Sequence, residues 1–214
     1  MILDFEKLAA RLMMPLPGAV AHEVARAVST GAMRPKFDHL LPPRPGSVLI
    51  LLYPEGEHIR FPLTKRHDYL GTHGGQISLP GGKAEANETS IETALREGEE
   101  EIGIDRKDIT VLGSLSDFFV IPSNFIVTPI VAMTSKRPLF IPQEREVMKI
   151  LEGDVEALLG KGSLKIKEIT VANMYNLNAP YFEIEGETVW GATAMMLNEF
   201  RYVVKDVLES ESMQ

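Results

Sequence analysis

The stretch Glu88–Ile104 reads ETSIETALREGEEEIGI, and it collects four glutamates within the eight residues Arg96–Gly103. The pattern predicts a helix, because Thr89 followed three residues later by Glu92 is typical of a capping box and Gly103 is a favourable helix end. The last turn of a helix carries unpaired carbonyls and a partial negative charge, so acidic residues are disfavoured there. The glutamates therefore need an explanation other than helix stability.

Helical spacing, at about 100° per residue, places Glu97, Glu100 and Glu101 on one stripe of this helix. The apolar stripe beside it consists of Ile91, Ala94, Leu95, Gly98 and Ile102. Each close pair of like charges costs a few tenths of a kcal/mol. A solvated acidic face is the common interpretation of such a run, but only one cation stands between Lys83 and Arg106. A cluster that repels itself suits hard divalent cations, so we favour metal binding.

A glycine-rich loop, SLPGGKAEANET from Ser78 to Thr89, leads into the helix. Gly81 and Gly82 allow the backbone to approach a ligand closely, and Lys83 supplies a point charge suited to phosphate. A tight turn is the alternative explanation for this loop. Taken together, the glycine loop, the helix and the acidic cluster predict metal-assisted chemistry on a phosphate group.

The composition is that of a globular chain with one substantial core: 214 residues, 44% hydrophobic and 24% charged. A net charge of −8 and a pI of about 5.2 provide no basic field for nucleic acid or an anionic membrane. The absence of cysteine excludes disulfides, thiolate zinc sites and a cysteine nucleophile. Without a signal-like start or an apolar run of about 20 residues, we expect a cytoplasmic protein.

The chain divides into an N-terminal helical and extended arm over residues 1–44, a main domain over 45–208 and a flexible tail over 209–214. The arm ends in the proline-rich stretch RPKFDHLLPPRPG, which suits neither a helix nor a central strand. Within the main domain we expect strands in SVLILLY, HIRFPLTKR, ITVLGSLSDFFV and NFIVTPIVAMT, a strand running into a helix over 146–160, a hairpin turning at Glu185-Gly186, and a closing helix over 193–208. This order predicts one mixed sheet with helices on both faces.

The spacing Gly82, five residues, Glu88, seven residues, then Arg96–Ile104 resembles the Nudix box, G-x5-E-x7-R-E-U-x-E-E-x-G-U, where U is a bulky apolar residue. One U position departs from the pattern, because it holds Gly98. The resemblance to Nudix hydrolases implies an α+β fold, an α/β/α sandwich with a mixed sheet. It also implies hydrolysis of a nucleoside diphosphate derivative assisted by Mg²⁺ or Mn²⁺.

The same resemblance assigns roles to individual residues. Glu97 and Glu101 would be metal ligands, and Glu100 would be a third ligand or would orient the attacking water. These three form the catalytic group, and Gly82 joins them in the metal site. The structural positions of the box would be Glu88, Arg96 and Gly103, with Arg96 and Glu88 pairing to hold the loop against the helix.

Upstream, LTKRHDYLGTHGGQISLPGG over residues 63–82 resembles the coenzyme A pyrophosphatase branch of the family, L-L-T-x-R-S-x-x-L-R-x-H-x-G-Q-[IV]-[AS]-F-P-G-G. His67, Gly71 and Leu79 depart from that signature, and at Gly71 the chain lacks an arginine able to hold phosphate bidentately. The resemblance implies hydrolysis of CoA to 4′-phosphopantetheine and adenosine 3′,5′-bisphosphate. The alternatives are another nucleoside diphosphate derivative, such as ADP-ribose or a nucleotide sugar, and a non-catalytic nucleotide-binding module.

Five positions are candidates for contact with this small-molecule substrate: Arg66, His73, Gln76, Ser78 and Lys83. Each has a structural alternative: a rim salt bridge for Arg66, a turn cap for His73, a solvated strand face for Gln76 and Ser78, and a tight turn for Lys83. Glu146 is interpreted as a surface charge, with a role as a further site acid as the alternative. The sequence leaves open whether the protein is a monomer or a homodimer.

Overall fold

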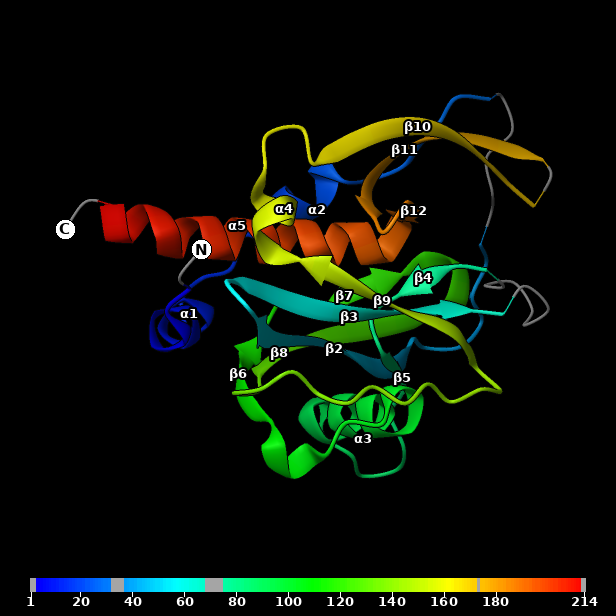
Figure 1. Cartoon of the computed structure of the whole chain (residues 1–214). Helices are drawn as coiled ribbons and strands as arrows, with labels where there is room; N and C mark the ends of the chain where they lie inside the picture. The colour runs from blue at the N-terminus through cyan, green and yellow to red at the C-terminus, as the bar shows by residue number, and fades with distance from the viewer. Residues whose placement is uncertain (1–2, 32–36, 68–74, 173, 213–214) are drawn as a thin grey trace.

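The computed structural model describes residues 3–31, 37–67, 75–172 and 174–212, and a mixed sheet of eight strands lies at its centre (Figure 1). The strands of this sheet are β2 (Arg44–Glu55), β3 (His58–Arg66), β4 (Ile77–Ser78), β5 (Gly81–Lys83), β6 (Thr110–Ser114), β7 (Phe118–Val120), β8 (Phe125–Met133) and β9 (Val147–Asp154). Strand β2 runs parallel to β8, and the other pairings are antiparallel.

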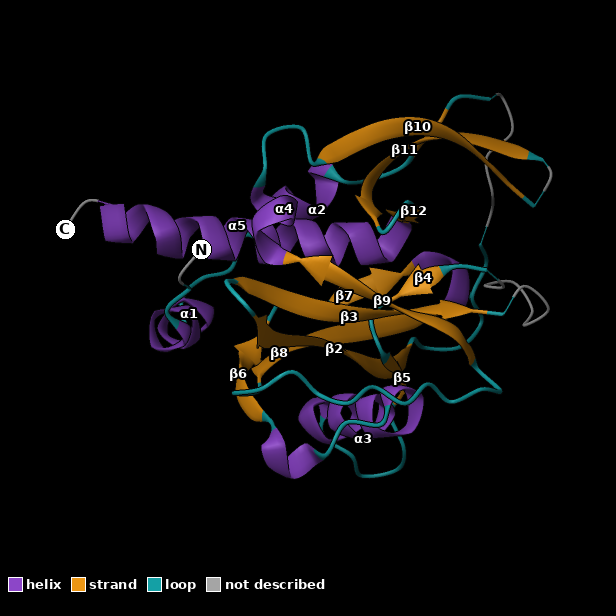
Figure 2. Ribbon diagram, viewed as in Figure 1, coloured by secondary structure: helices purple, strands orange, loops and turns teal. Residues whose placement is uncertain are grey.

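Helices cover both faces of this sheet (Figure 2). One face carries α3 (Ser90–Ile102), and the opposite face carries α5 (Gly191–Ser212) together with the smaller helices α1 (Phe5–Leu12), α2 (Ala19–Val24) and α4 (Val155–Leu159). Two 3-10 turns, at Arg106–Asp108 and Ile121–Ser123, complete the helical segments of the described chain. The predicted α/β/α sandwich with a mixed sheet is confirmed.

Strand β2 is apolar throughout its middle because both of its faces are covered. Ile50 and Leu52 belong to the core on the α5 side, whereas Leu49 and Leu51 belong to the core beneath α3. All four side chains are fully buried. The alternation of neighbouring residues between two cores fixes which face each side chain of β2 reaches.

A second, four-stranded sheet lies over α5 and was not predicted (Figure 1). It consists of β1 (Val28–Ser29), β10 (Leu164–Val171), β11 (Tyr175–Ile184) and β12 (Glu187–Trp190). The predicted hairpin turn at Glu185-Gly186 is confirmed, with both residues at positive φ, 48° and 78°. The prediction of a single sheet was incomplete: apolar and polar residues alternate along most of β10, as in a strand, but no strand was assigned there.

The N-terminal residues are bound to α5 through the buried carboxylate of Glu199. Its oxygens accept hydrogen bonds from the Ser116 hydroxyl at 2.6 Å and the Gly18 N–H at 3.0 Å, and His22 Nε2 lies 2.8 Å away. Burial alone would raise the pKa of Glu199, but the bonds with His22 and Ser116 lower it below its ordinary value. Residues 3–31 are thus packed onto the sandwich.

No helix within the described ranges is both long and apolar enough to cross a membrane.

Candidate active site on the glutamate helix

Helix α3 begins and ends where the sequence predicts. The Thr89 hydroxyl accepts from the Glu92 N–H at 3.3 Å, and the Glu92 carboxylate accepts from the Thr89 N–H at 2.8 Å, so the capping box is present. Gly103 ends the helix with φ at 73°, and a Cβ there would lie 2.9 Å from the Cβ of Ile141. Glycine is therefore required at this helix end by conformation and by space.

Gly98, which departs from the family pattern, is explained by its neighbours. A Cβ built on Gly98 would lie 2.8 Å from Ile104 Cδ1 and 3.0 Å from Leu49 Cδ2. These two side chains occupy the space that a bulky residue in the helix would otherwise fill.

One member of the predicted apolar stripe does not lie in the core. Ile91 is 43% exposed.

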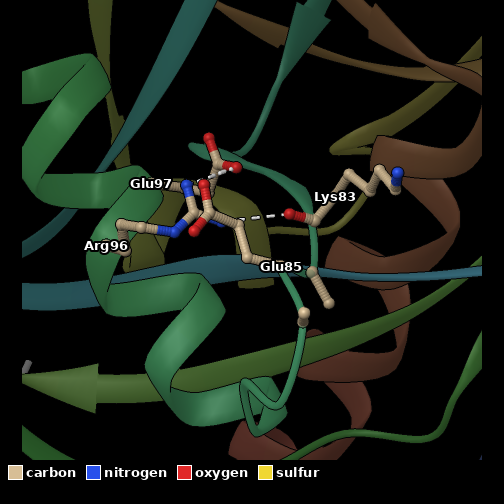
Figure 3. Close-up of a pocket in the computed structure, with 6 residues that line it drawn as sticks. Lys83, Glu85, Arg96 and Glu97 are labelled. Atoms are coloured by element: carbon tan, nitrogen blue, oxygen red, sulfur yellow. Dashed lines mark hydrogen bonds and ion pairs between the residues drawn. The ribbon is translucent and has the colours of Figure 1, made fainter.

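Arg96 connects the glycine loop to the helix (Figure 3). Its Nε donates to Glu88 at 2.7 Å, its Nη1 to Glu97 at 2.9 Å and Glu100 at 3.0 Å, and its Nη2 to the Lys83 carbonyl at 3.0 Å. The hydrogen bonds from Arg96 lower the pKa of Glu88 to about 2. The pairing of Arg96 with Glu88 that the resemblance implies is present, and the same guanidinium is a counterion for the glutamate cluster.

Two of the three stripe glutamates are withdrawn from solvent. Glu101 is 5% exposed, and its Oε2 accepts a hydrogen bond from the Gly81 N–H at 3.1 Å. Burial raises the pKa of Glu101 to about 7, against the opposing effects of Gly81 and the Arg66 charge. Burial also raises the pKa of Glu97, whereas the Glu100 side chain is 58% exposed. A solvated acidic face therefore describes Glu100 and not the other two.

A side chain at residue 82 would displace the carboxylate of Glu97, which lies against Gly82. A Cβ on Gly82 would lie 2.6 Å from the carboxyl carbon of Glu97. The Gly82 carbonyl oxygen lies beside Gly46 of β2, so a ligand role for that carbonyl stays a prediction. Figure 3 shows the Lys83 side chain directed away from Arg96 and Glu97. The adjacent pocket, of about 550 Å³, is lined by Lys83, Ala84, Glu85, Ala86, Arg96 and Glu97.

Three of the predicted substrate residues lie on or next to the paired strands β3 and β4. The Arg66 N–H donates to the Gln76 carbonyl at 3.0 Å, and Ser78 is the register partner of Thr64. Because Ile77 is buried in the core on the α5 side, Ser78 projects from the face that carries α3. Two positions singled out in the sequence lie outside the described residues, namely Gly71 and His73.

Glu146 was interpreted as a surface charge, with a role as a further site acid as the alternative, and the structure places its exposed side chain beside Arg66. Its Oε2 lies 3.3 Å from Arg66 Nη2, and its charge helps to raise the pKa of both Glu97 and Glu101. Glu146 immediately precedes β9, which pairs with β3, and this long-range pairing brings it to the cluster.

The donor set is compatible with a hard divalent cation. Among the described residues no three His, Cys, Asp or Glu side chains converge as metal ligands, because Arg96 holds Glu97 and Glu100 while Gly81 holds Glu101. Carboxylate oxygens are nevertheless the ligands that Mg²⁺ and Mn²⁺ prefer. The partly buried carboxylates of Glu97 and Glu101, with no side chain at Gly82 between them and the backbone, fit such an ion.

Comparison with known proteins assigns the family. The model of the NUDIX domain matches residues 43–160, more than half of the chain. The chain therefore belongs to the Nudix family. The protein is a Nudix-type hydrolase, an enzyme acting on the diphosphate bonds of nucleoside diphosphate derivatives, and enzymes of this family generally use divalent ions such as Mg²⁺ or Mn²⁺.

Individual relatives are similar over most of the chain. An uncharacterized Nudix hydrolase, NudL of Yersinia enterocolitica, is 36% identical over 136 residues, which cover 63% of this chain and 69% of NudL. Nudix hydrolase 22 of Arabidopsis thaliana, a chloroplastic protein, is 34% identical over 165 residues, covering 72% of this chain and 53% of its own. Among solved structures, the MutT protein of Methanosarcina mazei is 19% identical with a TM-score of 0.49, covering 81% of this chain and 99% of its own.

Proposed function

We propose that the protein hydrolyses the diphosphate linkage of coenzyme A or a CoA derivative, giving 4′-phosphopantetheine and adenosine 3′,5′-bisphosphate, with Mg²⁺ or Mn²⁺. The supporting observation is that both described ends of the segment resembling the CoA branch lie beside the Nudix glutamates. Gly81, at the end of that segment, donates to Glu101 at 3.1 Å. Arg66, near its start, is close enough to lower the pKa of the same carboxyl group.

We assign each residue of the site a role according to its position. Glu97 and Glu101 would hold the divalent ion, with Glu100 as a third ligand or the group that orients water. The bound ion would polarise phosphate oxygens and lower the pKa of the attacking water. Arg66 lies on β3 at the rim and would bind a phosphate oxygen through charge-assisted hydrogen bonds. Glu146 comes from a separate segment and is the candidate to accept the proton from water.

An acidic protein can bind this acidic substrate because cations lie between the two. The guanidinium of Arg96 already offsets part of the charge of Glu97 and Glu100, and Arg66 does the same for Glu146. Lys65 does not contribute to this balance, because it pairs with Glu187 of β12 at 2.7 Å on the other side of β3. Arg66 is therefore the cation of β3 to which the proposal assigns the substrate phosphate.

The test is a hydrolysis panel with Mg²⁺ and Mn²⁺ over CoA, acyl-CoA, ADP-ribose, NADH and diadenosine polyphosphates, with products identified by mass. We expect CoA to be cleaved with kcat/KM at least about tenfold above ADP-ribose, a difference of roughly 1.4 kcal/mol. A reversed order would favour a nucleotide-sugar or ADP-ribose substrate. Hydrolysis of none of them would favour a non-catalytic binding module.

A matched pair of variants controls the panel. Glu101→Gln removes a buried charge in the cluster, whereas Glu99→Gln removes an exposed charge in the same helix turn. Glu99 binds Arg106 Nε at 2.6 Å and lies at a position where the Nudix box places no requirement. We expect Glu99→Gln to retain wild-type activity in the panel and Glu101→Gln to lose most of it.

A further inference from the structure

Ser47 of β2 has a buried hydroxyl group with no hydrogen-bond partner among the described residues. The residue is 1% exposed. The next residues on the same face of β2, Leu49 and Leu51, are apolar and pack beneath α3. A buried polar group without a partner is costly, so a hydroxyl on this otherwise apolar face calls for an explanation.

The register of the sheet directs this hydroxyl towards Glu97. Ser47 is the antiparallel partner of Gly82, and opposed residues of such a pair project from the same face. On that face, the position of a Cβ on Gly82 lies 2.6 Å from the carboxyl carbon of Glu97. Leu49, two residues along β2, contacts Gly98, the neighbour of Glu97 in α3. Ser47 thus lies between the sheet and the helix, on the sheet side of the glutamate.

Glu97 is held from only one direction by the hydrogen bonds of the described residues. Arg96 Nη1 donates to its Oε1 at 2.9 Å, from the side of the helix that faces the pocket (Figure 3). A carboxylate that ligates a metal commonly also accepts a hydrogen bond from a residue behind it, which fixes its orientation. The register places the Ser47 hydroxyl on the side of Glu97 where Gly82 and β2 lie, and there it is an available donor.

We propose that Ser47 is a positioning residue that donates a hydrogen bond from its hydroxyl to the Glu97 carboxylate when that carboxylate binds the divalent ion. The inference rests on the metal-dependent function proposed above and adds to it a residue outside the Nudix box. Its consequence is specific. Removing the hydroxyl weakens metal binding, while the fold and the substrate contacts of Arg66 remain.

The experiment is a titration of the full-length protein with Mn²⁺, with free Mn²⁺ measured by electron paramagnetic resonance. We expect Ser47→Ala to raise the Kd for Mn²⁺ about tenfold or more. Its melting temperature in chelator should be unchanged or higher, because an unpaired buried hydroxyl is removed. Thr128→Val is the matched control: Thr128 is the register partner of Ser47 on β8, but its hydroxyl donates to Asp117 at 2.6 Å. Its Kd should stay at the wild-type value.

Two outcomes overturn the role of Ser47 alone. In the first, wild type and Ser47→Ala bind Mn²⁺ with the same Kd and both hydrolyse CoA. In the second, Ser47→Ala melts at a lower temperature in chelator with its Kd unchanged, which would make the hydroxyl merely structural. If the wild type itself binds no Mn²⁺ and hydrolyses no member of the panel, the proposed function fails together with the role of Ser47.

Discussion

Glu101 of α3 accepts a hydrogen bond from the backbone N–H of Gly81, 3.1 Å away, and this bond joins the glycine loop to the buried end of the helix. The acidic cluster at the unfavourable end of the helix is thus built into the packing of the site. Each glutamate of the cluster accepts a hydrogen bond. Arg96 donates to Glu97 and Glu100, and the Gly81 N–H of β5 donates to Glu101. A bound cation would complete the compensation that these contacts begin.

The first prediction concerns the charge of Glu101. Glu101→Gln should lower kcat by about 100-fold or more, because a proposed metal ligand loses its charge. The same variant should melt at a higher temperature in chelator, since a neutral amide is less costly to bury than a carboxylate and its oxygen can still accept from Gly81. Steady-state kinetics with Mn²⁺ and thermal unfolding in chelator measure the two effects. Full activity in Glu101→Gln would remove this residue from the catalytic group.

The second prediction concerns the packing of Gly98. Alanine is favoured over glycine in a helix by up to about 1 kcal/mol, yet a Cβ here would lie 2.8 Å from Ile104 Cδ1. We expect Gly98→Ala to be neutral or destabilising on its own. In the Ile104→Val background, which removes that methyl group, the same change should become stabilising.

Denaturant unfolding of the two single variants and the double variant gives the coupling energy between the positions, which we expect to be about 1 kcal/mol or more. Additive effects would mean that the contact between Gly98 and Ile104 does not limit the size of residue 98.

The third prediction concerns acid stability. Glu199 has a pKa lowered in the folded protein from its ordinary value of 4.5, so its contribution to stability is complete above pH 4.5 and is lost as the pH falls through the lowered pKa. Glu199→Gln should therefore reduce the free energy of unfolding at pH 7 by about 1.5–3 kcal/mol. The difference from wild type should shrink as the pH falls below 4.5.

The control for acid stability lies two turns away on the same helix. Asp206 pairs with Arg11 at 2.7 Å, but its side chain is 47% exposed, so Asp206→Asn should cost no more than about 1 kcal/mol. Urea unfolding of both variants between pH 3 and 7 measures the comparison. A difference between Glu199→Gln and wild type that does not change with pH would contradict the role of the ionised carboxylate.

The sequence predicts α3 to the residue because its signals are local. The capping box at Thr89, the glycine at 103 and the i, i+3, i+4 spacing all act within the helix itself. The apolar run of β2 likewise predicts a buried strand, since covering both faces demands apolar residues at every position. The helix α3 carries the Nudix glutamates, and β2 is the strand beneath that helix.

Features that depend on distant segments could not be predicted in the same way. Glu146 reaches the site because β9 pairs with β3, and Ser47 lies opposite Gly82 because β5 pairs with β2. Neither pairing is encoded in the residues immediately around those side chains. The second sheet was missed for a related reason, because β10 is mostly exposed and its stability as a strand comes from its partner β11.

The last prediction separates two roles for Arg66. Its Nη2 lies 3.3 Å from Glu146 Oε2, with the arginine side chain 34% exposed and the glutamate 54% exposed. A surface pair of this kind contributes at most about 1 kcal/mol to stability. If Arg66 binds substrate phosphate, however, its charge-assisted hydrogen bond contributes about 1.5–3 kcal/mol to the free energy of substrate binding.

We therefore expect Arg66→Ala to raise KM for CoA about tenfold or more, with a smaller effect on kcat. Glu146→Gln should instead lower kcat and leave KM nearly unchanged, because the proposed role of that carboxylate is to accept the proton from water. The double variant should then show both defects together. If Arg66 served only to hold Glu146, the two single variants would share one defect, a lowered kcat, and the double variant would be no worse than either. Steady-state kinetics on these three variants distinguishes phosphate binding from a rim salt bridge.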